Sequence, residues 1–308
     1  MPVKVAPTNA STTPNRRPSR HTVHHKGAIV GFLAPFIVVF GLFYVVPIGY
    51  AIYQSFFKIE REGAFGAPQQ VFGGLSQYAT VFGSTEFWSS ISRVLIFFCI
   101  SIPIQLGLAL IFALLLDSPV LKGKSFFRIV IFAPYAVPGV IAAIMWGFLY
   151  VPSLSPFPAI AENVPLLGSQ LVLFSIANVV NWVFTGYNML IIYSALKAIP
   201  YDMIEAARMD GAGQLRIAWS IKIPIVAPAL ILTGVFAIIG TLQLFNEPTV
   251  FRTFASAVES TYTPNMVVYS TSSVPNYNLA AAYSVVLALA TCVLSFTFLK
   301  ITQKRAFG

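Results

Sequence analysis

The stretch AIPYDMIEAARMDGAGQLRIAWSIKIPIVAP, residues 198–228, is the longest polar interruption between apolar segments that still has a helical composition. Pro200 can open a helix, because proline is tolerated in the first turn, and Gly211 can end one, because glycine accepts the left-handed conformation common at helix C-termini. A second helical piece then runs to Ile223, and Pro224 marks the return to apolar sequence. We therefore expect two short helices that meet at a glycine bend and are presented to a partner outside a membrane.

The composition on either side of this stretch is that of a membrane protein. Of 308 residues, 57% are hydrophobic and only 9% are charged, which is too little charge to cover a soluble globule of this size. A span needs about 20 mainly apolar residues. Six segments qualify: residues 28–56, 87–116, 126–151, 170–195, 225–245 and 279–301. We expect an all-α fold with a disordered tail over residues 1–26 and one transmembrane domain over residues 27–308.

The basic residues predict the orientation of these six spans. Fifteen of the 19 lie on the side of the N-terminus, and positively charged loops stay in the cytoplasm. Both termini are therefore expected in the cytoplasm, together with the polar elbow, residues 198–224. Because topology explains the basic excess, it gives no reason to expect a nucleic-acid partner. The other four basic residues face outward: Lys58, Arg61, Arg93 and Arg252.

Polar side chains within the spans suggest a path for a solute. The fourth span has four of them, spaced by three, four and three, so that they share one helical face. The fifth span ends in three more. Polar groups in hydrocarbon usually face a bundle interior or a water-filled path, although amides that only bond one helix to another give the same pattern. The seven candidates are Asn178, Asn181, Thr185, Asn188, Gln243, Asn246 and Glu247.

The sequence contains no pattern typical of catalysis, nucleotide binding or metal binding. The phosphate-cradling pattern GxxxxGK[ST] is absent, and so are HExxH, CxxC and GxSxG. Intramembrane charges arranged as a proton or ion relay are also missing. We therefore predict no enzyme activity, no metal site and no cofactor bound by this chain. The energy for any transport must come from a partner, through the elbow.

The elbow resembles the EAA motif in permease subunits of binding-protein-dependent ABC importers, in the carbohydrate branch of that family. The residues that carry the match are Glu205-Ala206-Ala207, Asp210-Gly211-Ala212, Ile221, Pro224 and Pro228. Two longer pieces extend it: LAPFIVVFGLFYVVPIGYAIYQSF, residues 33–56, and KGKSFFRIVIFAPYAVPGVIAAIMWGFLY, residues 122–150. The resemblance thus covers nearly the whole chain after its tail.

This resemblance implies a sugar permease of a bacterial inner membrane, with a coupling helix between spans four and five. The implied partners are a second similar permease, two ATPase subunits that bind ATP and Mg²⁺, and an external solute-binding protein, which can be a lipoprotein. Membrane lipid and a sugar complete the set. The residues expected to couple to the ATPase are Glu205, Ala206, Ala207, Asp210, Gly211, Ala212 and Pro224.

Three departures from the family pattern bear on this interpretation. Ala218 stands where the family usually has phenylalanine, and Trp219 is its neighbour. The turns expected after spans three and five are replaced at residues 151–155 and 246–249, which leaves the sugar undefined. Glycerol phosphate or another polyol is an alternative solute. A self-contained carrier or channel, or a membrane anchor for a cytoplasmic complex, is an alternative of another class.

The first outer loop, residues 57–86, is longer than a bare connection requires. Its charge cluster over residues 58–62 is either a solvated connector or a docking surface for an external protein. Nothing in its composition separates the two interpretations.

Overall fold

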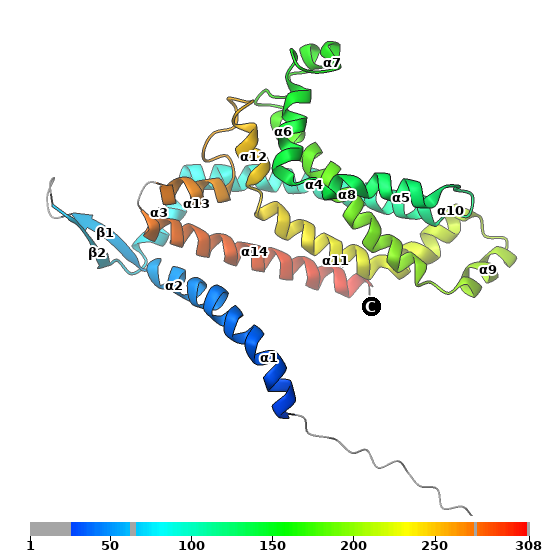
Figure 1. Cartoon of the computed structure of the whole chain (residues 1–308), viewed down its shortest axis with the longest axis horizontal. Helices are drawn as coiled ribbons and strands as arrows, with labels where there is room; N and C mark the ends of the chain where they lie inside the picture. Colours follow the sequence, from blue (N-terminus) through cyan, green and yellow to red (C-terminus); the bar gives the residue numbers. More distant parts are fainter. Residues whose placement is uncertain (1–25, 62–65, 274–275, 307–308) are drawn as a thin grey trace, which may run out of the picture. The chain divides into compact units, whose positions relative to one another are not determined.

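The computed structural model describes residues 26–61, 66–273 and 276–306, and these form helices and one small hairpin (Figure 1). The chain divides into two units, Met1–Ile48 and Gly49–Gly308. The first contains α1 (Lys26–Phe40), a π-turn η1 (Gly41–Val45) and the start of α2 (Val46–Gln54). The predicted disordered tail, residues 1–26, lies outside the described residues except for Lys26, where α1 begins.

The second unit contains the remaining elements. Its strands are β1 (Phe57–Arg61) and β2 (Pro68–Phe72). Its helices are α3 (Ser76–Gly83), α4 (Thr85–Asp117), α5 (Lys124–Phe132), the 3₁₀ turn η2 (Ala133–Ala136), α6 (Gly139–Tyr150), α7 (Pro158–Asn163), α8 (Val172–Lys197), α9 (Tyr201–Met209), α10 (Gln214–Ile217), the π-turn η3 (Ala218–Lys222), α11 (Ile223–Leu242), α12 (Asn246–Phe251), α13 (Pro264–Ser273) and α14 (Tyr277–Ala306).

Five helical segments of the described chain are long and apolar enough to cross a membrane, and a sixth is added if one bent pair counts as a span. That pair is Lys124–Ala136 and Gly139–Tyr150, bent by 97°. The predicted span 126–151 is therefore not one straight helix. The cause is Pro138, because a residue before proline is driven out of helical geometry, and Val137 is extended with φ −83° and ψ 124°.

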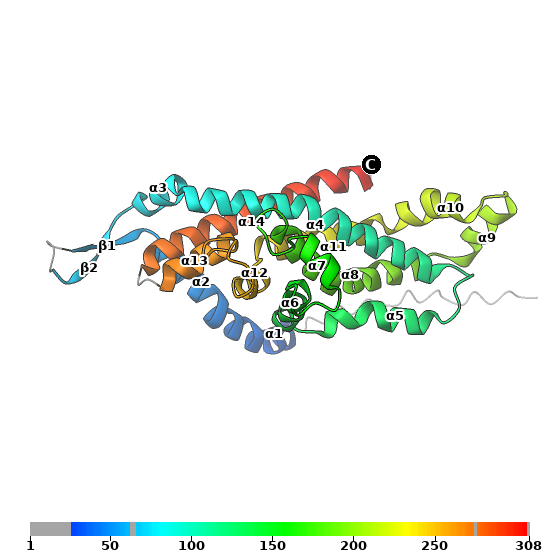
Figure 2. The same ribbon diagram turned by 90° about the horizontal axis from the view of Figure 1, so that it is seen from above.

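The relative direction of the central helices follows from three side-chain contacts. Ser101 bonds Asn181 and Asp117 bonds Lys197, so α4 and α8 run parallel with a constant offset of 80 residues. Lys222 also reaches Asp117, so α11 starts where α4 and α8 end. Figure 2 shows α4 and α8 side by side, and the chain between them must return over their common length. Lys124–Tyr150 makes most of that return.

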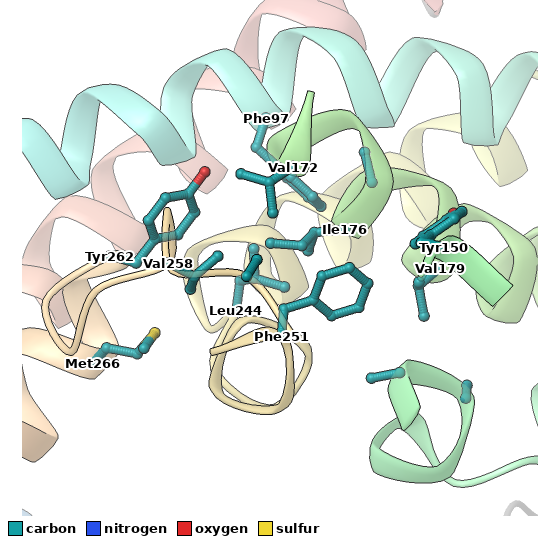
Figure 3. Packing of buried hydrophobic residues seen from close by; sticks show 14 of the residues in the cluster. Phe97, Tyr150, Val172, Ile176, Val179, Leu244, Phe251, Val258, Tyr262 and Met266 are labelled. Carbon is teal, nitrogen blue, oxygen red and sulfur yellow. The ribbon is translucent and has the colours of Figure 1, made fainter. Parts of the chain in front are cut away.

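Two buried clusters hold these helices together. The larger joins α4, α6, α8 and α12, and Figure 3 shows Phe97, Ile176 and Phe251 among its members. The second lies nearer the elbow and joins α4, α8 and α11 through a layer of aliphatic side chains. Its fully or nearly fully buried residues are Ala109, Ala113, Leu116, Met189, Ile192, Leu196 and Val226.

The expectation of an all-α fold is wrong in the first outer loop, where β1 and β2 form an antiparallel hairpin. Phe57 pairs with Phe72 and Arg61 with Pro68, and the rings of Phe57 and Phe72 meet edge to face at 5.6 Å. Apolar and polar residues do alternate in β1, from Phe57 to Glu60, but they do not alternate in β2, so the sequence gives no paired strand signal. Asn278 at the start of α14 donates to the carbonyl of Gln54 at 3.0 Å, just before the hairpin.

Candidate functional site

The first helix of the elbow, residues 198–224, is α9, and a Schellman motif ends this helix. Pro200 precedes the first residue of α9, and Gly211 has φ +80°, as predicted. The N–H of Gly211 donates to the carbonyl of Arg208 at 3.0 Å, and that of Ala212 to Ala207 at 2.9 Å. These two bonds satisfy carbonyls that a helix end leaves open, and the motif needs a left-handed residue at the position of Gly211. The glycine bend is therefore a specific turn.

The second half of the elbow differs from the prediction. The short helix expected to stop at Ile223 continues through a π-turn, Ala218–Lys222, directly into α11. The N–H of Ile223 bonds the carbonyl of Ala218, five residues back instead of four. A wider turn here relieves the clash that the ring of Pro224 would make with the preceding turn. The same arrangement precedes Pro47, where η1 ends.

Some residues of the elbow are buried against the rest of the chain, and others are exposed. Ile204 and Ile217 are buried, whereas Glu205, Ala206, Asp210 and Gly211 are exposed. Six of the seven predicted coupling residues therefore lie on one accessible segment, residues 205–212, with Ala207 and Ala212 partly covered, and the seventh, Pro224, is exposed in the first turn of α11. Large apolar side chains are exposed beside them, which is typical of a surface awaiting a partner. They are Tyr201, Met203, Met209, Leu215 and Trp219.

The elbow's stems meet at a carboxylate that the sequence did not single out. Asp117, the last residue of α4, binds Lys197 through Oδ1 at 2.8 Å and Lys222 through Oδ2 at 2.6 Å. A cavity of about 360 Å³ opens beside them and is also lined by Lys124 and Arg208. The available signal was a single acid at the end of one span and a lysine at each foot of the elbow.

The stripe on α8 makes bonds between helices along part of its length. Asn178 donates to the hydroxyl of Tyr150 on α6 at 2.8 Å, and Asn181 accepts from Ser101 on α4 at 2.7 Å. Thr185 donates to the carbonyl of Asn181 at 2.5 Å. These three residues line an open groove of about 400 Å³ whose other walls are mostly apolar. Here the pattern of bonds favours helix packing, the alternative that the sequence left open.

Asn188 points into a second cavity, together with the three candidates from the end of the fifth span. We call this space, about 270 Å³ in volume, the Glu247 cavity. Asn188 is buried and makes no side-chain hydrogen bond among the described residues, so its amide stays available. Sequence reasoning missed Gln105 of α4, which closes one side. The cavity's polar side chains are Gln105, Asn188, Thr241, Gln243, Asn246 and Glu247, and its aromatic ones are Phe184, Tyr187, Phe236 and Phe245.

Two local features shape the Glu247 cavity. α11 ends at Leu242, earlier than the predicted residue 245, and the chain turns before α12 begins at Asn246. This turn brings Glu247 against Gly139, the first residue of α6, where a Cβ would lie 2.9 Å from Oε1 of the carboxylate. A helix N-terminus carries partial positive charge, so it favours an acid at this position. The departure at residues 246–249 is thus a short helix and not a plain turn.

At the end of α4 remote from the elbow, Arg93 packs on an aromatic ring. Its guanidinium carbon lies 5.0 Å from the ring centre of Tyr262, a cation–π geometry. Burial raises the pKa of the Tyr262 phenol, and the nearby positive charge offsets this in part, so the phenol stays neutral at ordinary pH. This contact joins α4 to the loop before α13.

Known permeases resemble this chain along almost its whole length. The sn-glycerol-3-phosphate transport system permease protein of Agrobacterium fabrum is 30% identical over 284 residues, which are 89% of this chain and 94% of that protein. The chain belongs to the family of sugar ABC transporter permeases. Two further members are 29% identical: the lactose transport system permease of Rhizobium radiobacter, with 86% of this chain and 90% of that protein covered, and the trehalose/maltose permease of Thermococcus litoralis, with 91% and 96%. No protein-family profile matches the chain.

Solved structures show that this permease has the fold of ABC importers. A bacterial transporter that imports the acidic polysaccharide alginate superposes with a TM-score of 0.77 at 16% identity, over 91% of this chain and 96% of that one. The methionine ABC transporter MetNI gives 0.53 at 17% identity, over 70% and 96%. At such identities the likeness concerns the fold. The permease is a multi-pass membrane protein.

Among the described residues, the permease holds no group of three or more side chains suited to a metal ion. Its cysteines, Cys99 and Cys292, are free thiols.

Proposed function

We propose that this chain forms half of the translocation path of an ATP-driven sugar importer and receives its energy through the elbow from separate ATPase subunits. The observation that carries the proposal is the elbow itself: its tip is ordered by a Schellman motif, exposed and rimmed by apolar side chains. The chain has no phosphate-cradling loop of its own. A coupling helix formed by residues 201–209 is the simplest use of such a surface.

The proposed topology has six crossings with both termini in the cytoplasm. Because α4 and α8 run parallel and end together at Asp117 and Lys197, the chain between them has to return across the membrane. This supports counting the bent pair α5–α6 as a span. The basic loops favour placing the elbow on the cytoplasmic side. In a chain whose Cys99 and Cys292 are replaced by serine, single cysteines are introduced at Met209 and Leu154. An impermeant reagent should modify only Leu154→Cys in intact cells.

The proposed partners are a second permease, two ATPase subunits and an external binding protein. A homologous assembly is supported by the alginate transporter, which was solved in complex with a periplasmic protein that holds an alginate pentasaccharide. The number of each subunit follows from the expectation that one elbow serves one ATPase.

We further propose that the solute is a neutral sugar that contacts the Glu247 cavity. The described lining contains amides, two hydroxyls, one acid and aromatic faces, but neither lysine nor arginine. Amides and a carboxylate suit hydroxyl groups, and aromatic faces suit the apolar faces of sugar rings. A phosphate would normally find a basic partner. Glycerol phosphate, named for several relatives, is thus the less favoured solute.

The test is uptake by proteoliposomes that contain the permease pair, the ATPase subunits and the binding protein. Sugar uptake should require ATP and should fall to background in Glu205→Ala and Gly211→Pro, with both variants still in the membrane. Unchanged uptake in both variants would refute the proposed coupling. Transport by the chain without ATPase subunits would favour a self-contained carrier, and competition by glycerol phosphate but not by sugars would favour the other solute class.

A further inference from the structure

Asp117 holds both stems of the elbow at one point. Lys197 precedes α9 by a few residues, and Lys222 closes the π-turn behind it, so the whole segment between them is a loop with its two feet on one carboxylate. Each carboxylate oxygen takes one lysine. This contact therefore joins the C-terminal ends of α4 and α8 to the residue that directly precedes α11.

The two ion pairs are unequal in their surroundings. The side chains of Asp117 and Lys222 are 13% and 10% exposed, whereas that of Lys197 is 51% exposed. A buried charge left without its partner is strongly unfavourable, while an exposed pair contributes little. We therefore expect the contact between Asp117 and Lys222 to carry most of the effect.

The layer above this contact is close packed. Leu116 and Leu196 of α4 and α8 are buried beside Val226 of α11, with further aliphatic side chains behind them. Packed interiors transmit a displacement instead of absorbing it. The rest of the elbow is held differently, because Ile204 and Ile217 are its only buried residues apart from Lys222.

We propose that Asp117 is a positioning residue that clamps both stems of the elbow to α4, so that a movement of α9 displaces α4, α8 and α11 as one body. This inference rests on the proposed function, since it concerns how the elbow passes on motion from an ATPase. Asp117 itself meets neither solute nor nucleotide. Without this contact, α9 can still bind the ATPase, but its movement no longer displaces α4, α8 and α11.

The experiment compares transport with ATP hydrolysis in the complete reconstituted importer. In Asp117→Asn and in Lys222→Gln, we expect ATP hydrolysis to continue and the amount of sugar taken up per ATP to fall about tenfold, because the buried partner is left unpaired. Asp117→Glu keeps the carboxylate and should therefore keep most of the wild-type amount of sugar taken up per ATP. Lys197→Gln should have the smaller effect.

The matched control is Lys124→Gln, which removes a lysine from the same cavity without touching Asp117. It should keep the wild-type ratio. A wild-type ratio in both Asp117→Asn and Lys222→Gln would overturn the clamp. Failure of both variants to assemble, with no recovery in Asp117→Glu, would also overturn it, because the residue would then serve folding alone. A wild-type importer without ATP-dependent uptake would instead refute the proposed function.

Discussion

The elbow and the Glu247 cavity are built in opposite ways. The elbow comes from one continuous segment of about 27 residues whose form is set by neighbours in sequence: Pro200 before α9, Gly211 after it and the π-turn before Pro224. The Glu247 cavity collects side chains from α4, α8, α11 and α12, none of which shapes it alone. A local site can be recognised by its residues, whereas an assembled one depends on how helices pack.

This contrast predicts that tight packing matters most near the cavity. A Cβ on Gly186 of α8 would lie 2.1 Å from the carbonyl oxygen of Ile131, so Gly186→Val must push α5 away from α8. We expect loss of most folded protein, measured as the monodisperse fraction in detergent, since overpacking alone costs about 1–3 kcal/mol and backbone contact leaves little room to relax.

The matched control for Gly186→Val lies in the elbow. A Cβ on Gly213 meets nothing within 4 Å, and its φ is an ordinary −72°. Gly213→Ala should therefore fold and transport like the wild type. Equal yields of folded Gly186→Val and Gly213→Ala would show that the close approach of α5 and α8 is not needed.

Removing the charge of the cavity should affect uptake and spare docking. We expect Glu247→Gln to lower ATP-dependent uptake about tenfold, because a hydrogen bond to a charged group contributes about 1.5–3 kcal/mol. Binding of the ATPase subunits, measured by co-purification, should not change. Glu259→Gln removes an exposed acid from the loop before α13 and should leave both quantities unchanged. A loss of ATPase binding in Glu247→Gln would erase the distinction between the two regions.

A substitution in the elbow should weaken binding of the ATPase subunits and leave the solute preference unchanged. Trp219 is 71% exposed on the elbow, beside Ala218, the position at which the EAA pattern that the elbow resembles would have phenylalanine. We expect Trp219→Ala to weaken ATPase binding about tenfold, in line with aromatic residues that dominate interfaces. Adding Ala218→Phe to Trp219→Ala should recover part of it. Unaltered ATPase binding in Trp219→Ala would mean that Trp219 does not take the place of the phenylalanine that is missing at position 218.

The smallest effect is expected from the stripe on α8. Asn178→Ala leaves the hydroxyl of Tyr150 without its donor, and a typical hydrogen bond contributes about 1 kcal/mol. The thermal midpoint in detergent should drop by a few degrees while the solute affinity stays the same. A marked change in solute affinity would instead indicate that Asn178 contacts the solute, contrary to the packing role that its bond to Tyr150 favours.

The order of the helices, the elbow and its glycine bend could be predicted from the sequence, because apolar runs, Pro200 and Gly211 act over a few residues. The break at Pro138 was harder to foresee, since proline occurs within other helices here, at Pro103 and Pro228, without ending them. The spacing of Asn178 and Asn181 indicated that they share one helical face. Only the packing of α4 and α6 against α8 decides which groups form hydrogen bonds with these amides.

Asp117 and Gln105 were missed for the same reason. Each is a single polar residue near or within an apolar helix, and the partners that give it meaning are about 80 or more residues away in sequence. The hairpin was missed for a different reason: the alternation of apolar and polar residues in β1 has no counterpart in β2, the strand with which it pairs.

The π-turn before Pro224 also sets an angle. It holds one residue more than an α-helical turn would, so everything on its N-terminal side is rotated about the helix axis relative to α11 by about 100°, the rotation of one residue. Deleting a single residue from Ala218–Lys222 would restore ordinary winding and swing the exposed tip of α9 to another side of the bundle. The direction in which the elbow, the proposed docking surface, faces is thus set by the length of this segment as much as by its side chains.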